Sequence, residues 1–383
     1  MTQQNLDEMR TKIDDIDSKM TALFKERMEL SLDIARYKKE HNLPVFSDSR
    51  EKEILHKVSE DIGEPFDGYA RLLYSTIFDA SRSCQNNYLA RKSDLVKRIE
   101  HALSETPELF PKKAVVACQG VAGSHSQAAC EKLFEVPSIM YFNSFEGVFN
   151  AVEKGLCQYG ILPIENSSYG SVGAVYDLMQ NYNFHIVKSL RLRISHNLMA
   201  KPGTKLSDVR EIFSHEQAIG QCGDFLKSLK DVKVTVCENT ALAAKMVAES
   251  DRTDVAAISS KECLDLYGLE LLKKHIQLSD NNYTRFICIS KKLEIYPGSN
   301  KISLILSLPH VPRSLYLTIA KFAALGINLT KLESRPIPGS DFEFMFYFDL
   351  EASVYSKELL NLLSELENQP ETFVFLGCYS EAI

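Results

Sequence analysis

The chain has 383 residues, of which 45% are hydrophobic and 25% are charged, and its formal net charge is −7. This length exceeds what one ordinary hydrophobic core supports, so we expect three domains. The sequence contains no long apolar run, which excludes a membrane span, and its acidic balance argues against nucleic acid as the main partner.

The N-terminal segment and the cysteines narrow the expectations further. The first residues contain no basic segment followed by an apolar block, so we expect no secretion signal and a cytoplasmic protein. The nine cysteines include no Cys-x-x-Cys pair, and no histidine stands at metal-ligand spacing. We interpret them as small buried thiols rather than as zinc ligands or a disulfide framework.

Residues 7–40 contain neither proline nor glycine, and apolar residues recur there at three- and four-residue steps. This pattern predicts one amphipathic helix of roughly 35 residues, on the order of 50 Å long. A second helix is expected from Asp48, capped with the help of Glu51, and a third from Pro65 past Gln85. Because a domain of about 100 residues cannot bury so long a stripe, we predict a homodimer here.

The cations on this first helix are spaced for a small anion. Arg27 and Lys38 lie 11 residues apart, which returns to within about 20° of the same face, so they could hold the two ends of one dianion. Arg10 points about 100° away from Arg27, and could reach such a site only in a partner subunit. Ser81 and Gln85, one turn apart on the third helix, add neutral hydrogen-bonding groups. Each of these residues alone also fits an ordinary solvated surface.

Together these residues resemble the small all-helical chorismate mutase domain. The resemblance implies an intertwined dimer in which Arg10 of one subunit completes the site of the other. The residues it assigns to catalysis are Arg10, Arg27, Lys38, Glu51, Ser81 and Gln85. The rearrangement needs a compact dianion and donors such as Lys38 and Gln85 at the ether oxygen, and no nucleophile.

The second helix departs from the family pattern at one position. Ser47 and Arg50 would bind substrate, but Ser47 stands where the family has aspartate, with Asp48 shifted by one residue. Either the loop is shifted in register or binding of the substrate hydroxyl is weaker.

After a proline-containing linker at residues 107–111, short β runs alternate with helices up to about residue 295. Polar clusters follow several strands, at the ends where open α/β sheets bind ligands. These clusters are residues 120–126, 163–170, 214–218, 238–240 and 281–286. We therefore predict two α/β lobes with one binding cleft between them. The β-rich run at residues 184–199 has few turn residues, so we expect the chain to cross between the lobes there. The glycines of residues 120–126 match neither a phosphate loop nor a dinucleotide fingerprint.

The cluster Asn281–Phe286 opens an apolar strand with a hydroxyl, a guanidinium and a ring at consecutive positions. Taken alone it also fits an edge strand with solvated polar ends, because a buried guanidinium must be paired. The clusters named above favour a functional interpretation.

In this order the motifs resemble the catalytic domain of prephenate dehydratase, which has a two-lobed fold like that of periplasmic binding proteins. The resemblance implies that Thr284 donates to the leaving hydroxyl, directly or through water, and that Arg285 and the Ser124 loop help to hold carboxylate. Phe286 would wall the ring pocket. The residues expected to complete the cleft are Asn166, Ser167 and Thr240. No metal or organic cofactor is implied.

Beyond a second linker at residues 297–299, the expected elements follow the order βαββαβ, which is a ferredoxin-like α+β unit. Its third strand is expected to start at Phe342. Glu333, Ser334 and Arg335 resemble the effector motif of ACT domains attached to prephenate dehydratases. This resemblance implies phenylalanine as an allosteric effector, bound between subunits. Arg313 and Ser314 stand where the pattern has glycine and alanine, which could retune the feedback.

The resemblance covers nearly the whole chain and predicts a multidomain protein with domains at residues 1–105, 106–295 and 296–383. It implies an enzyme of phenylalanine biosynthesis that converts chorismate to prephenate and prephenate to phenylpyruvate, as a homodimer or higher homo-oligomer. Two alternatives stay open: a dehydratase with a weakened mutase domain, and a non-catalytic sensor of amino or aromatic acids. Against the sensor, no basic DNA-reading element is visible.

Overall fold

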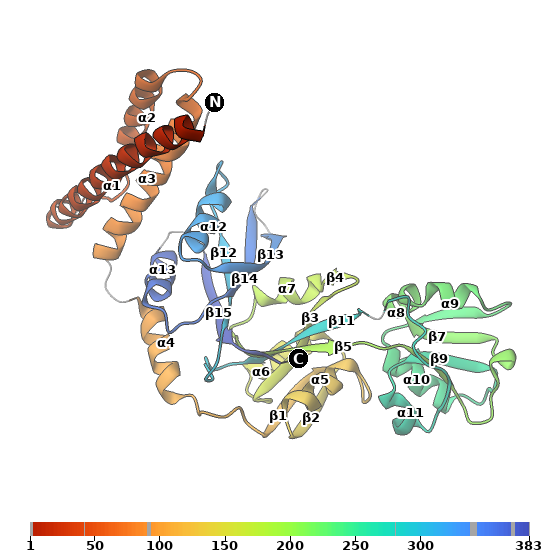
Figure 1. Cartoon of the computed structure of the whole chain (residues 1–383). Helices are drawn as coiled ribbons and strands as arrows, with labels where there is room; N and C mark the ends of the chain where they lie inside the picture. Colours follow the sequence, from red (N-terminus) through yellow and green to blue (C-terminus); the bar gives the residue numbers. More distant parts are fainter. Residues whose placement is uncertain are drawn as a thin grey trace. The chain divides into compact units, whose positions relative to one another are not determined.

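The computed structural model of the chain describes residues 3–41, 43–89, 93–279, 281–337, 343–368 and 372–382. The chain divides into two compact units whose segments alternate along the sequence (Figure 1). The first unit consists of Met1–Lys97, Val311–Leu325 and Ser356–Pro370, and the second of Arg98–His310, Gly326–Tyr355 and Glu371–Ile383. The domain boundaries expected near residues 105 and 295 stay predictions, because this division interleaves the C-terminal segments.

The first unit is built from helices. They are α1 (Gln3–Glu40), α2 (Asp48–Ile62), α3 (Asp67–Leu89), the start of α4 (Asp94–Glu105), α12 (Ser314–Ala324) and α13 (Lys357–Glu367). Helix α1 has 38 residues, in line with the uninterrupted periodicity of its sequence. Helix α2 ends at Gly63, whose φ of +68° lies in the left-handed region that favours glycine. The prediction of three N-terminal helices is confirmed.

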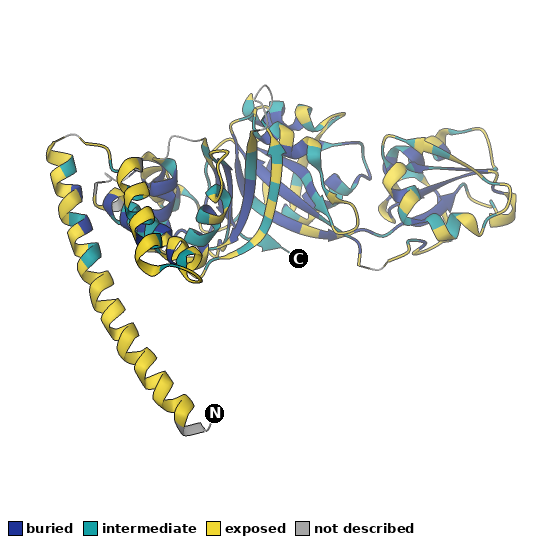
Figure 2. Cartoon of the chain, turned by 90° about the horizontal axis from the view of Figure 1, so that it is seen from above, coloured by how far each residue is buried: buried dark blue, intermediate teal, exposed yellow. Residues whose placement is uncertain are grey.

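The apolar stripe of α1 is largely exposed in the single chain, as the yellow ribbon of this helix shows in Figure 2. Leu23 is 65% exposed, although leucine is usually buried. The exposed members of the stripe are Leu6, Met9, Ile13, Ile16, Met20, Leu23, Phe24, Leu30, Ile34 and Tyr37. A continuous exposed apolar surface of this length is typical of an interaction surface.

The second unit contains three sheets, and the first is a seven-stranded sheet in the order β16-β5-β11-β3-β1-β2, with β4 paired to β3. Its strands are β1 (Lys113–Gln119), β2 (Val136–Phe142), β3 (Tyr159–Asn166), β4 (Gly170–Ser171), β5 (His185–Arg193), β11 (Tyr283–Ser290) and β16 (Glu381–Ala382). The helices between these strands are α5 (His125–Leu133), α6 (Phe145–Glu153) and α7 (Gly173–Met179). Strand β11 runs antiparallel to both of its neighbours, β3 and β5, which places it inside the sheet.

The second sheet has the strand order β10-β6-β9-β7-β8. Its strands are β6 (Asn197–Ala200), β7 (Glu211–His215), β8 (Lys233–Cys237), β9 (Val255–Ser259) and β10 (Glu270–Lys273), and its helices are η1 (Leu206–Asp208), α8 (Glu216–Gln221), α9 (Gly223–Lys227), α10 (Thr240–Glu249) and α11 (Glu262–Tyr267). The long β run at residues 184–199 divides into β5 and β6, which belong to different sheets. The prediction that the chain crosses between two lobes there is confirmed.

The third sheet has the order β13-β14-β12-β15, with neighbouring strands antiparallel. Its strands are β12 (Lys301–Ser307), β13 (Asn328–Pro336), β14 (Phe344–Glu351) and β15 (Phe373–Tyr379). With α12 and α13 between them in the sequence, these elements follow the predicted βαββαβ order. The expected start of the third strand, Phe342, lies outside the described residues. We call this sheet the regulatory sheet below.

One hydrophobic core joins the first sheet to the regulatory sheet. Val175 and Tyr176 of α7 pack in the same cluster as Ile305, Tyr347 and Tyr379 of the regulatory strands, and all five are buried. The rings of Tyr176 and Tyr347 meet edge to face, with 4.9 Å between their centroids. The two sheets are therefore one packed body within the second unit.

Each of the nine cysteines is a free thiol, and all except Cys84 and Cys237 are buried. This arrangement agrees with their interpretation as small core residues. Among the described residues, no helix is both long enough and apolar enough to cross a membrane.

Candidate active sites

In the first unit, α1 and α3 bring two predicted site residues together. Arg27 donates a hydrogen bond from Nη1 to Ser81 Oγ, and its guanidinium lies 5.7 Å from the ring centroid of Phe78. Ser81 in turn donates to the carbonyl of Ile77, 2.8 Å away. Burial lowers the pKa of Arg27, and the neighbouring Tyr74 and Glu51 oppose that shift. The guanidinium is thus a partly buried cation facing neutral hydrogen-bonding groups.

Gln85 lies one turn beyond Ser81 on α3, and both side chains are buried. The Oε1 atom of Gln85 has no hydrogen-bond partner among the described residues. Buried amide groups are normally satisfied, so an unpaired one marks a position where a ligand can bind. This position fits the predicted role of Gln85 as a contact to substrate.

Three other residues predicted for the mutase site have partners of their own in the single chain. Lys38 donates from Nζ to the carbonyl of Val45 at 2.5 Å. Arg10 is exposed and pairs with Asp7 at 3.4 Å, and Arg50 pairs with Glu53 at 2.7 Å. The expectation that Arg10 serves a partner's site agrees with its exposure and stays a prediction.

Glu51 points toward a cation that the sequence reasoning missed. Arg82 donates to Glu51 and to Asp79, and its guanidinium lies 5.4 Å from the ring of Phe46. The spacing of Asp79 and Arg82 on one helix was the available signal. Ser47 is the N-cap of α2 but makes no capping hydrogen bond. The side chain of Asp48 lies outside the described residues, so the two alternatives for this loop stay open.

In the second unit, the register of β3 and β11 places Asn166 directly opposite Thr284. Asn166 Nδ2 donates to Thr284 Oγ1 and to Asn282 Oδ1, each at 3.0 Å. Asn166 Oδ1 accepts from the backbone N–H groups of Ser168 and Tyr169, at 2.9 and 3.1 Å, which fixes the orientation of the amide. Thr284 Oγ1 therefore accepts a hydrogen bond and keeps its own proton to donate.

Beyond Asn282, a chain of neutral polar groups continues into the second lobe. Asn282 Nδ2 donates to Gln221 Oε1 at 2.8 Å, and His196 Nε2 lies 2.6 Å from the same oxygen. His125 stands next to His196, with 6.4 Å between the ring centroids. Burial lowers the pKa of His196, and burial followed by His196 lowers that of His125 to about 4, so both rings are neutral at pH 7.

Sequence reasoning did not select Gln221, His196 or His125. His125 lies inside the predicted glycine-loop cluster, and Gln221 follows the cluster at residues 214–218 by three positions, so proximity to these clusters was the only signal. A cavity of about 220 Å³ lies beside this chain of groups. It is lined by Ser168, Tyr169, Gly220, Gln221, Gln277, Leu278, Ser279 and Asn282. The cavity is thus formed by residues of both lobes.

The glycine loop also reaches the second lobe. Tyr267 of α11 donates to the carbonyl of Ala122 at 2.7 Å, and a Cβ on Gly123 would lie 2.8 Å from Cys263 Sγ. Ser124 caps α5 by accepting from the N–H of Gln127 at 3.4 Å. The loop is therefore a contact between the lobes, and Ser124 lies buried at the start of a helix.

Ser167 and Thr240 differ in their surroundings. Ser167 Oγ donates to the carbonyl of Asn281 and accepts from the N–H of Tyr283, each at 2.9 Å, so it holds the backbone that leads into β11. Thr240 is buried in the first turn of α10, in the second lobe. Their predicted contacts to substrate stay predictions.

Arg285 and Phe286, the two residues that follow Thr284 on β11, have different surroundings. Successive side chains of a strand point to opposite faces, and Arg285 lies on the face opposite Thr284. Its guanidinium donates to Asp349 and, at 2.8 Å, to the hydroxyl of Tyr379, and it lines a cavity of about 450 Å³ together with Ser167 and Asn281. Its predicted contact with a substrate carboxylate stays a prediction. Phe286 is 2% exposed and lies in a hydrophobic core with Cys288 of the same strand. Its predicted role as a wall of the ring pocket stays a prediction.

The predicted effector residues lie on β13. Glu333 accepts from Ser171 Oγ at 2.6 Å, and Arg335 pairs with Asp177 through two contacts of 2.7 and 2.8 Å. Ser334 is exposed on the other face of the strand. Arg313, just before α12, has a φ of +78°, the backbone conformation for which the family pattern has glycine.

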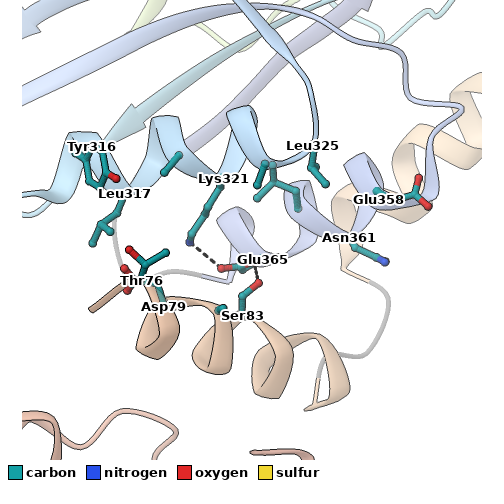
Figure 3. A pocket seen from close by; sticks show the side chains of 14 residues that line it. Thr76, Asp79, Ser83, Tyr316, Leu317, Lys321, Leu325, Glu358, Asn361 and Glu365 are labelled. Atoms are coloured by element: carbon teal, nitrogen blue, oxygen red, sulfur yellow. Dashed lines mark hydrogen bonds and ion pairs between the residues drawn. The ribbon is translucent and has the colours of Figure 1, made fainter. Parts of the chain in front are cut away.

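A further cavity of about 400 Å³ lies among α3, α12 and α13 of the first unit (Figure 3). Glu365 crosses it, accepting from Lys321 Nζ and from Ser83 Oγ, each at 2.7 Å. The residues that line it include none of the predicted site residues. The cavity is distinct from the Arg27–Ser81 pair, although Ser83 lies on the same helix.

Comparison with known proteins bears on both sites. The family model for chorismate mutase type II matches residues 9–86, and the model for prephenate dehydratase matches residues 116–294. The chain is 37% identical over 276 residues to arogenate dehydratase/prephenate dehydratase 2 of Arabidopsis thaliana, a match that covers 69% of this chain and 72% of that protein.

Among solved structures, the prephenate dehydratase of Arthrobacter aurescens in complex with L-Phe has a TM-score of 0.64 at 27% identity, and the match covers 70% of this chain and 90% of that one. A chain described as a quorum quenching acylase has the same TM-score at 29% identity, covering 70% and 98%. Over its full length the chain is similar to the bifunctional chorismate mutase/prephenate dehydratase of Escherichia coli K12, with 30% identity over 390 residues that cover 99% of this chain and 97% of that protein. This protein therefore belongs to the bifunctional chorismate mutase/prephenate dehydratase family.

Proposed function

We propose that this chain rearranges chorismate to prephenate and then converts prephenate to phenylpyruvate. The observation that carries the proposal is the presence of two separate sites on one chain, the Arg27–Ser81 pair in a chorismate mutase domain and the Asn166–Thr284 pair in a prephenate dehydratase domain. The two reactions are consecutive, since the product of the first is the substrate of the second.

At the mutase site, the residues bind and compress a dianion. Arg27 and Lys38 supply positive charge on one face of α1, and Gln85 supplies an unpaired buried amide. Negative charge develops on the ether oxygen as the C–O bond breaks and the new C–C bond forms, so positioned donors lower the barrier without proton transfer. Ser81 holds the Arg27 guanidinium in place.

The exposed stripe of α1 supports a homodimer for this part of the chain. A second copy would cover the ten exposed apolar residues and could bring Arg10 to the other subunit's site. The mutase site is then complete only in the dimer, because Arg10 lies too far along α1 from Arg27 to act in its own chain.

At the dehydratase site, the proton of the Thr284 hydroxyl moves toward the leaving hydroxyl, which departs as water, and a proton from solvent restores the Thr284 hydroxyl. The bond to the ring carboxylate breaks at the same time, and its electron pair completes the aromatic ring while CO₂ leaves. Asn166 orients Thr284 Oγ1 by donating to it at 3.0 Å. The neutral surroundings formed by Asn282, Gln221 and His196 suit a carboxylate that must lose its charge.

Phenylalanine is the proposed effector, bound through the strand that carries Glu333, Ser334 and Arg335. The complex of the Arthrobacter aurescens protein with L-Phe supports this proposal. Adding phenylalanine should inhibit the dehydratase and raise the thermal midpoint of the protein, since a ligand that binds only the folded state stabilises it. The absence of both effects would refute the regulatory role.

One experiment separates the proposal from its alternatives. Chorismate is supplied to the purified protein, and prephenate and phenylpyruvate are both followed with time. Formation of both products supports the proposal. Use of added prephenate without turnover of chorismate would indicate a dehydratase with a weakened mutase domain, and turnover of neither would indicate a sensor.

A further inference from the structure

Strands β3 and β11 carry two consecutive cross-strand pairs whose side chains lie on opposite faces of the sheet. Asn166 lies opposite Thr284, and the preceding residue Glu165 lies opposite Arg285, the residue after Thr284. Because successive side chains alternate between the faces of a sheet, the polar pair lies on one face of these strands and the ionic residues lie on the other, where they line a cavity of about 450 Å³. Each proposed active-site residue therefore has a charged neighbour directly behind it.

Behind Asn166, Glu165 is held by a lysine of the regulatory sheet. Lys331 of β13 places Nζ 2.8 Å from Glu165 Oε1 and 2.8 Å from Ser171 Oγ. Its side chain is only 14% exposed, so water screens this contact weakly. Ser171 also donates to Glu333, two residues further along β13, at 2.6 Å. The end of β3 is thus fastened to β13 by a connected set of charged and polar groups.

Behind Thr284, Arg285 is held by a different strand of the same sheet. Asp349 of β14 accepts from its Nη1, and the Asp349 side chain is 1% exposed. Glu381 of β16 lies 3.2 Å from Nε. Ser303 donates to Asp349 and lies 2.7 Å from the hydroxyl of Tyr379, so the carboxylate is itself oriented. Burial by itself lowers the pKa of Arg285, but Tyr379 and Asp349 raise it above its usual value, so the guanidinium stays charged.

We infer that Lys331 and Asp349 are positioning residues for the dehydratase reaction, Lys331 acting on Asn166 through Glu165 and Asp349 acting on Thr284 through Arg285. The inference rests on the proposed role of Thr284. Lys331 and Asp349, which we call the two anchors, lie on the neighbouring strands β13 and β14. Their relative position therefore fixes the position of β11 against β3, and with it the hydrogen bond from Asn166 to Thr284. A displacement of about 1 Å at a reacting group is enough to lower turnover on the order of a hundredfold.

The same contacts could serve stability alone, and the two roles have different signatures. A positioning role predicts a fall in kcat with KM nearly constant, in protein that is fully folded at the assay temperature. A role in stability alone predicts normal kcat for whatever fraction is folded. The mutase activity of the same chain serves as an internal control, since its residues lie in the other unit.

The test compares Lys331→Met with Lys331→Arg in the full-length protein. Lys331→Met removes the charge while keeping much of the side chain's length, and Lys331→Arg restores the cation. The matched control is Glu351→Gln, which alters an exposed polar pair with Asn328 on the same two strands, at 2.7 Å, away from β3 and β11. Asp349→Asn is the companion variant for the second anchor.

We expect Lys331→Met and Asp349→Asn to lower the dehydratase kcat at least tenfold, with KM changed less than threefold and mutase activity unchanged. Lys331→Arg and Glu351→Gln should stay within twofold of the parent. The assays are carried out at a temperature well below each variant's thermal midpoint. The folded fraction is measured by circular dichroism. If Asp349→Asn does not fold, Glu165→Lys combined with Lys331→Glu provides the second test, and it should recover part of the kcat lost in Lys331→Met.

A kcat within twofold of the parent in Lys331→Met would overturn the inference, as would a loss in proportion to the unfolded fraction. Failure of the proposed function gives a different result. In that case the parent protein itself would not turn over prephenate, or removal of the Thr284 hydroxyl would leave turnover intact, whatever the behaviour of the Lys331 variants.

Discussion

Arg27 of α1 and Ser81 of α3 are 54 positions apart in the sequence and share a hydrogen bond. Replacing Arg27 by methionine removes the cation and leaves Ser81 without this donor. We expect mutase kcat/KM to fall roughly a hundredfold or more, since a positioned charged donor is worth about 3 kcal/mol to a transition state. The decrease in chorismate absorbance measures this effect. The dehydratase activity of the same preparation is the control, and mutase activity within threefold of the parent would contradict the assignment.

Thr284 can be tested without altering the shape of its site. Thr284→Val keeps the branched side chain and removes the hydroxyl that accepts from Asn166 and that we propose as the donor to the leaving group. Positioned proton donors contribute about 10²- to 10⁴-fold, so the dehydratase kcat should fall within that range. Thr284→Ser keeps the hydroxyl and should keep most of the activity. Equal rates for the valine and serine variants would remove Thr284 from the mechanism.

The stripe on α1 predicts a variant that separates the two activities. Ile16→Glu places a charge among the exposed apolar residues of α1, where burial against a second copy would desolvate it. We expect the mass measured by sedimentation to fall, and mutase activity to fall with it, while the dehydratase is retained. Ser18→Glu, nearly opposite on the helix, is the matched control. If Ile16→Glu kept both the parent mass and the parent mutase activity, the dimer would not use this stripe.

Buried histidines make stability depend on pH. Burial, followed by the nearby Arg98, lowers the pKa of His185 from 6.5 to about 4. Between these values the unfolded chain binds more protons than the folded one, so stability is full above pH 6.5 and is lost as the pH falls toward 4. For this one group the loss between pH 7 and pH 5 is roughly 2 kcal/mol.

Thermal midpoints at pH 7 and pH 5 test this expectation. His185→Gln should reduce the difference between the two midpoints, whereas the same change at the exposed His101 should not. A pH dependence of the same size in parent and His185→Gln would assign the effect to other groups.

The helices and the order of the strands could be predicted because their signals are local. Helix α1 follows from three- and four-residue spacing over residues 7–40, and the βαββαβ order follows from alternating runs and turn residues. The sequence predicted that the chain crosses between the lobes at residues 184–199, but not that the two halves of this run join different sheets. One apolar run contains no information about the strands with which its two halves pair.

The roles of Arg285 and Gln221 could not be predicted, for the same physical reason. Arg285 was expected to hold a carboxylate because the resemblance to prephenate dehydratase implies it, whereas its partner Asp349 lies 64 positions further along the chain. Gln221 meets Asn282 only because two lobes fold against each other. The sequence around residue 285 correctly indicated that a buried guanidinium would need an ionic partner. The tertiary structure supplies Asp349 as that partner.

Gly377 of β15 limits how the C-terminal region of this protein can be deleted or exchanged. A Cβ at this position would lie 2.2 Å from the carbonyl oxygen of Ile186, so the backbones of β15 and β5 touch. Four residues later the chain joins β5 as the parallel edge strand β16. Deleting the C-terminal region would strip β5 of its outer neighbour and leave an open sheet edge, which promotes aggregation. A chimera that takes its C-terminal region from a protein with another effector specificity should therefore keep Gly377 and β16. Otherwise β5 must be exchanged along with them.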